Sequence, residues 1–108
     1  MAADLKRKQF KTLKTNHITM SYNGWSNQET YIADLWLSND FEMYTFMEEL
    51  AEEVQGEKYP VNKMGDILQK EFKKNMPNLS GLYGDLLSNA LDNVNFREIC
   101  DSFLEDYE

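Results

Sequence analysis

The spacing of apolar and polar positions predicts a chain of short helices from about residue 27 onward. In five consecutive segments, apolar residues recur every three or four positions, as on one face of a helix. Alternation typical of a strand is confined to Ile18, Met20 and Tyr22, too few positions for a sheet. The candidate residues at the helix starts are Ser26, Asn39, Tyr59, Ser80, and Asn93 or Asn95. We therefore expect an all-α fold, in which residues 17–108 form a single compact domain of five or six short helices packed as an irregular bundle.

The first predicted helix follows a turn and a cap. Asn23 and Gly24 form a turn pair because both residue types tolerate positive φ. Ser26 lies three residues before Glu29, which is the spacing of a capping box. The polar residues around this helix are therefore expected to cap it and to tie its two ends in place.

The helix itself, about residues 27–38, is apolar on nearly every side, and only Asp34 interrupts its surface. A helix that is apolar all round is usually buried. We therefore expect a central helix, with Trp25 and Trp36 as core anchors. The alternative is a stacking platform of aromatic rings that also includes Tyr31.

The second predicted helix, which ends near Gln55, has an apolar and an acidic face. Asn39 is its expected cap, with Glu42 at the third helical position. Its apolar stripe consists of Met43, Met47, Leu50 and Val54. Its outer face carries Glu48, Glu49, Glu52 and Glu53, a pattern typical of a solvated surface.

The remaining three helices are predicted from the same periodicity. Pro60 suits the first turn of the third helix, and Pro77 ends it. The apolar side of the fourth helix is expected at Leu82, Tyr83, Leu86, Leu87, Ala90 and Leu91. The inner face of the fifth is expected at Phe96, Ile99, Cys100, Phe103 and Tyr107.

The charge is distributed unevenly along the chain. The net charge is −8, but residues 1–16 hold five Lys or Arg and one Asp, which leaves −12 on residues 17–108. We expect residues 1–16 to be a basic leader, either a frayed helix or a mobile arm. The acidic remainder disfavours binding to the phosphate backbone of nucleic acids and favours docking on a basic surface.

No pattern of catalytic or metal-binding residues stands out in the sequence. The single cysteine, Cys100, lies on an apolar helix face and is expected to be a small core residue. The single histidine, His17, adjoins the basic leader, and no metal-ligand spacing is present. We therefore expect no enzyme, no cofactor and no metal, and we expect neither a membrane span nor a secretion signal, which places the chain in the cytoplasm.

The stretch from Asn23 to Asp40 resembles the signature NGWxNxETxxxxLWxxND of a family of small proteins from phages, plasmids and other mobile elements. A second stretch of similarity lies in residues 84–99. The signature residues that we expect to be structural are Asn23, Gly24, Trp25, Ser26, Asn27, Glu29, Trp36, Asn39 and Asp40.

The resemblance implies a function in binding rather than in catalysis. Small acidic phage proteins often inhibit host nucleases, polymerases or CRISPR complexes, so the favoured hypothesis is an anti-defence inhibitor, with anti-CRISPR action as the leading case. The expected partner is a host protein, such as a CRISPR effector or another nucleic-acid enzyme. The expected partner-binding acidic face consists of Glu42, Glu48, Glu49, Glu52, Glu53, Asp101, Glu105, Asp106 and Glu108. The alternatives are a structural or accessory phage protein that acts by self-association, as a homodimer for example, and, as a third hypothesis, an enzyme.

Overall fold

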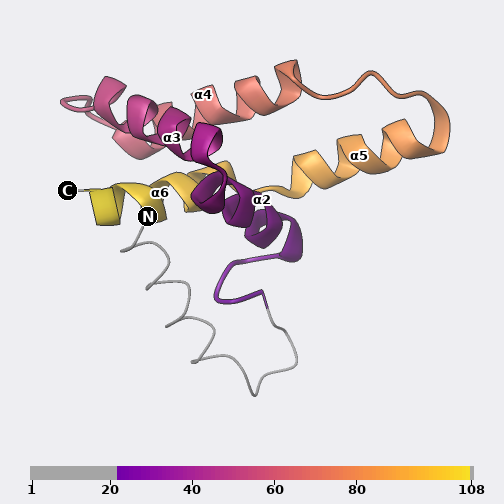
Figure 1. Ribbon diagram of the computed structural model, residues 1–108, viewed down its shortest axis with the longest axis horizontal. Helices are drawn as coiled ribbons and strands as arrows, with labels where there is room; N and C mark the ends of the chain where they lie inside the picture. The colour runs from indigo at the N-terminus through magenta and orange to yellow at the C-terminus, as the bar shows by residue number, and fades with distance from the viewer. Residues whose placement is uncertain (1–21, 108) are drawn as a thin grey trace.

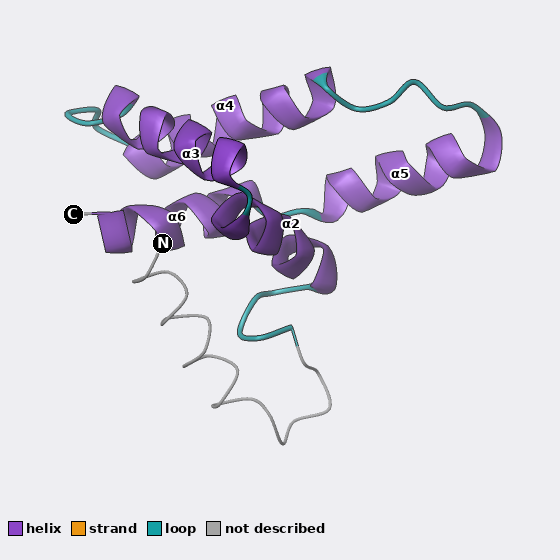
Figure 2. Ribbon diagram, in the orientation of Figure 1, coloured by secondary structure: helices purple, strands orange, loops and turns teal. Residues whose placement is uncertain are grey.

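Helices make up most of the part of the chain that the structure describes. The computed structural model describes residues 22–107, and within this range helices follow one another with no strand (Figure 1). The helices are α2 (Gln28–Asn39), α3 (Phe41–Glu53), α4 (Pro60–Lys74), α5 (Gly81–Asn93) and α6 (Phe96–Tyr107). Turns and loops connect them, as Figure 2 shows. The predicted all-α class is confirmed, whereas the basic leader 1–16 and His17 lie outside the described residues.

The core is built around α6, which packs along α4 and also contacts α2 and α3. Two aromatic pairs join different helices: Tyr44 meets Phe103 edge to face at 5.7 Å between ring centroids, and Phe72 meets Phe96 at 5.0 Å. Within α6, Phe103 stacks on Tyr107 at 5.8 Å. The buried apolar residues are Trp25, Ala33, Leu37, Met47, Leu50, Ala51, Val54, Met64, Leu68, Phe96, Ile99, Cys100 and Phe103.

The prediction that α2 is a central helix was wrong, because only one of its sides is buried. Ile32, Leu35 and Trp36 are 46%, 37% and 57% exposed. Asp34, which interrupts the apolar surface, is instead buried at 4% exposure. On the buried side, Thr30, Asp34 and Ser38 form a polar stripe at four-residue intervals. The apolar Ala33 and Leu37 are buried beside it.

The buried polar stripe is tolerated because its members are hydrogen-bonded. Ser38 Oγ donates to Asp34 Oδ1 at 3.3 Å, and Thr30 Oγ1 accepts from the backbone N–H of Asn95 at 2.8 Å. Burial of this side of α2 therefore leaves Ile32, Leu35 and Trp36 on the surface, which hydropathy alone does not anticipate.

The caps of α2 and α3 each lie one residue after their predicted positions. Asn27, not Ser26, caps α2, because its Oδ1 accepts from Thr30 N at 2.8 Å. Asp40, not Asn39, caps α3 by accepting from Met43 N at 3.0 Å. A carboxylate at a helix N-terminus gains from the helix dipole, which favours Asp40 over an amide at this position.

Candidate functional site

A turn before α2 places Trp25 in the core. Asn23 and Gly24 have φ of 54° and 91°, and Trp25 N donates to Tyr22 O at 2.9 Å. Positive φ at both central positions is the geometry in which an Asn-Gly pair is favoured, as predicted. Trp25 is 4% exposed, so its predicted role as a core anchor is confirmed.

Polar residues that follow the turn join the start of α2 to the end of α5 and to the first turn of α6. The backbone N and Oγ of Ser26 donate to Glu98 Oε1 at 3.3 and 2.7 Å. Asn27 Nδ2 donates to the carbonyl oxygen of Asn93 at 2.7 Å. Ser26 therefore ties two helices together, where the sequence suggested a cap of its own helix.

Thr30 and Asn95 complete this connection, which we call the polar clamp (Ser26, Asn27, Thr30, Asn93, Asn95 and Glu98). Asn95 Oδ1 accepts from Glu98 N at 3.0 Å, which confirms Asn95 as a capping residue of α6. The N–H of Asn95 donates to Thr30 Oγ1. Ser26 and Asn27 of the signature thus serve architecture, because they join the start of α2 to the first turn of α6 and to the end of α5.

Thr30→Val is expected to lower the free energy of unfolding by about 1–3 kcal/mol, since it removes the acceptor of the Asn95 N–H while keeping the side-chain shape. Thr30 is 0% exposed, so water cannot replace the lost oxygen without rearrangement. Thr45→Val is the matched control: Thr45 Oγ1 donates to Phe41 O at 2.9 Å in an exposed position, and its loss is expected to cost no more than about 0.5 kcal/mol. Urea unfolding followed by circular dichroism measures the stability of both variants. Equal losses of unfolding free energy would contradict a stabilising role of the hydrogen bond between Thr30 and Asn95.

The predicted acidic residues of the second helix all lie on the exposed side of α3. These residues, which we call the α3 acidic surface, are Glu42, Glu48, Glu49, Glu52 and Glu53. The helix holds no Lys or Arg. The opposite side of α3 packs on the core through Met47, Leu50, Ala51 and the following Val54.

The charges of the α3 acidic surface oppose the stability of their own helix. Only Glu42 lies in the first turn, where the helix dipole favours an anion. The other four lie in the second half, and the pairs Glu48–Glu52 and Glu49–Glu53 place like charges four residues apart. The arrangement is therefore not explained by the stability of α3.

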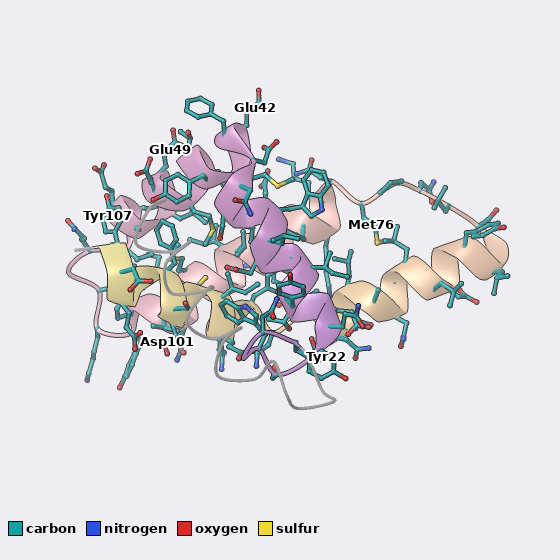
Figure 3. The ribbon with its side chains drawn as sticks, turned by 60° about the horizontal axis from the view of Figure 1, so that its bottom comes forward. Tyr22, Glu42, Glu49, Met76, Asp101 and Tyr107 are labelled. Carbon is teal, nitrogen blue, oxygen red and sulfur yellow. The ribbon has the colours of Figure 1, made fainter. Side chains whose placement is uncertain are left out.

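The acidic residues of α6 lie apart from the α3 acidic surface. Figure 3 shows Glu42 and Glu49 on one side of the body and Asp101 on the opposite side, with Tyr107 between them. Glu105 follows Asp101 at four-residue spacing and is exposed, and the two form what we call the α6 acidic surface. Asp106 is half-buried, and Glu108 lies outside the described residues.

Tyr107 links the end of α6 to α3. Partial burial of its hydroxyl raises the pKa of Tyr107, and the nearby carboxylates of Glu52 and Glu48 raise it further. The Glu52 side chain therefore lies close to the Tyr107 hydroxyl. Glu48 and Glu52 therefore contribute to the α3–α6 contact. Glu49 and Glu53 are better positions for testing the α3 acidic surface by substitution, because they do not take part in this contact with Tyr107.

The candidate chemistry elsewhere is limited. Burial raises the pKa of the Cys100 thiol to about 12, and the side chain is 0% exposed, which confirms its prediction as a core residue. Within residues 22–107, no group of three or more His, Cys, Asp or Glu side chains could hold a metal ion. None of the described helices is long and apolar enough to cross a membrane.

Three residues on the predicted apolar side of α5 lie on the surface. Leu82, Tyr83 and Leu86 are 68%, 72% and 57% exposed. The same holds for Trp36 of α2, which was expected in the core. The apolar periodicity of these helices indicates a surface that packs against something. It does not show whether that surface packs against the rest of this chain or stays exposed.

Comparison with known proteins gives a family but no activity. A family model described as "Family of unknown function (DUF7249)" matches residues 18–106. Among curated proteins and among solved structures, none is significantly similar to the chain.

Proposed function

The chain belongs to the family of unknown function DUF7249, and from this premise we propose that it acts by binding another protein and not by catalysis. The proposed target is a host complex that processes nucleic acid, with a CRISPR effector as the leading case. The proposed setting is the host cytoplasm, where the chain serves a phage or another mobile element as an anti-defence inhibitor. The α3 acidic surface is the proposed contact.

The observation that carries the proposal is the placement of charge on α3. Four glutamates lie in the second half of a helix without Lys or Arg, against the helix dipole and in like-charge pairs. Such an arrangement weakens the helix, so a role outside the fold accounts for it better than a role in stability. Channels for nucleic acid are lined with Lys and Arg, and a rigid anionic helix is electrostatically complementary to them.

The test begins by identifying the target. The chain is used as bait in host lysate treated with nuclease, bound proteins are identified by mass spectrometry, and the captured complex is purified. Its nuclease or polymerase activity is then titrated with the chain. Inhibition at stoichiometric amounts supports the proposal; a captured complex whose activity does not change would contradict it.

The double variant Glu49→Lys/Glu53→Lys is expected to lose inhibition by at least about tenfold, because it reverses two charges at the proposed contact. Its free energy of unfolding is expected to rise by a few tenths of a kcal/mol or more, since cations suit the end of a helix. The matched control is Asp101→Lys/Glu105→Lys on the α6 acidic surface, which makes the same charge change on the other side of the body (Figure 3). Full inhibition by the α3 variant, or equal loss in the two variants, would contradict a contact through α3.

A further inference from the structure

Only part of the apolar side of α5 is covered by the rest of the described chain. No residue of this helix is buried. The half near Asn93 lies against α2, while the half near Gly81 extends beyond the other helices, as Figure 1 shows. Leu82, Tyr83 and Leu86 continue the apolar stripe of Leu87 and Leu91 along this outer half. An amphipathic helix normally has a partner along the whole of its apolar face.

The outer half of α5 is held in place by close backbone packing. The loop that precedes α5 lies directly against Gly84, where a Cβ atom would overlap the carbonyl oxygen of Leu79. A glycine is therefore needed at this position for the loop and the helix to approach each other. Leu79 is itself 49% exposed.

Two apolar hollows flank the inner half of α5. One of about 400 Å³ lies between α5, α3 and α4, and the other, of about 280 Å³, lies between α5 and α2. They share Met43, Phe72, Leu87 and Leu91, so they form one apolar groove. The exposed Trp36 of α2 lies at this groove. The surface thus presents an apolar ridge beside an apolar groove.

The ridge carries few charges, whereas the wall of the groove includes Glu29, Glu42 and Glu71. The only charged residues of α5 are Asp85 and Asp92, and Asp92 lies 3.8 Å from Lys73. In α2 they are Glu29 and the buried Asp34. Because residues 17–108 carry −12, a second copy of this chain can approach at low electrostatic cost only where few carboxylates lie.

The exposed apolar area is comparable with that of a stable dimer interface. The side chains of the ridge and the groove that contribute are Ile32, Trp36, Met43, Leu82, Tyr83 and Leu86. At the ~150–250 Å² of an aromatic side chain, taken as an upper value for the other side chains, their exposed fractions leave on the order of 700 Å² per copy. A standard interface buries ~800 Å² per partner.

We propose that the chain forms a two-fold homodimer through α5 and α2. The ridge of Leu82, Tyr83 and Leu86 of each copy packs into the apolar groove of the other copy. A ridge and a groove that adjoin on one surface are self-complementary, so one rotation brings both pairs together and closes the assembly. The groove is filled in the manner of an amphipathic helix in an apolar cleft.

Multi-angle light scattering of the full chain tests the proposal. The wild type is expected at twice the chain mass of 12.7 kDa, and Leu82→Glu/Leu86→Glu at 12.7 kDa. The variant is expected to keep its helical circular dichroism, because both side chains are exposed. Phe41→Glu is the matched control: Phe41 is 80% exposed but lines neither hollow, and this variant is expected to stay dimeric.

Quenching of Trp36 fluorescence by acrylamide gives a second readout. Dilution of the wild type is expected to increase quenching as the groove opens, whereas the Leu82→Glu/Leu86→Glu variant is quenched equally at all concentrations. A wild type of 12.7 kDa at every concentration would overturn the proposal, as would a dimer that survives in the double variant or is lost in Phe41→Glu. Glu49→Lys/Glu53→Lys is expected to leave the dimer mass unchanged. A failure of the dimer proposal can therefore be distinguished from a failure of the proposed inhibitor function.

Discussion

Trp25→Ala is expected to lower the free energy of unfolding by about 3–5 kcal/mol, the range for truncation of a large buried aromatic residue. Trp25 is 4% exposed and belongs to the core cluster that also includes Phe96 and Ile99. Trp36→Ala removes the same chemical group from a side chain that is 57% exposed, and it is expected to cost less than about 1 kcal/mol in the monomer. The two tryptophans are therefore a matched pair with opposite expected outcomes.

Urea unfolding followed by circular dichroism at a fixed low concentration measures both variants. The spectroscopic signature should agree with the energetics: Trp25 is expected to emit at shorter wavelength and to resist acrylamide, and Trp36 to be readily quenched. Single-tryptophan chains made with Trp25→Phe or Trp36→Phe separate the two signals. A larger loss of stability from Trp36→Ala than from Trp25→Ala would contradict the placement of α2.

The contrast between the tryptophans shows where the sequence was informative about α2 and where it was not. The helix and its approximate ends follow from apolar spacing and turn residues. Which side is buried does not, because Thr30, Asp34 and Ser38 are buried with hydrogen-bond partners, one of them contributed by Asn95, 65 residues away. A polar stripe is predicted as exposed unless its distant partners are known.

The same distinction applies to the candidate sites. The glutamates of α3 were predicted on an outer face, and they lie there because the opposite side carries Met47 and Leu50. Their separation from Asp101 depends on how α6 packs against α3 and α4, which periodicity within one helix does not encode. The bond between Ser26 and Glu98 spans 72 residues, so capping rules assigned Ser26 a local role instead.

Above pH 9, the chain is expected to lose stability through Cys100, by about 2.5 kcal/mol between pH 8 and pH 11. Burial raises the pKa of the thiol from 9.0 to about 12 in the folded chain, so the folded state retains a proton that the unfolded state releases. The contribution of a group with a raised pKa is complete below the unfolded value of 9.0 and is lost as the pH rises toward about 12.

Cys100→Ala isolates this effect, because the variant keeps every other titrating group, including Tyr107, whose pKa is also raised. The variant is expected to be somewhat less stable than the wild type at pH 8, since it leaves a small cavity, and the difference should shrink or reverse by pH 11. Urea unfolding at pH 8, 9, 10 and 11 measures both chains. In the folded wild type at pH 8, the thiol is expected to react with a disulfide reagent only as fast as the chain opens, because the thiolate is the reactive form. Immediate reaction of the folded chain, or parallel pH profiles of the two chains, would contradict a fully buried Cys100.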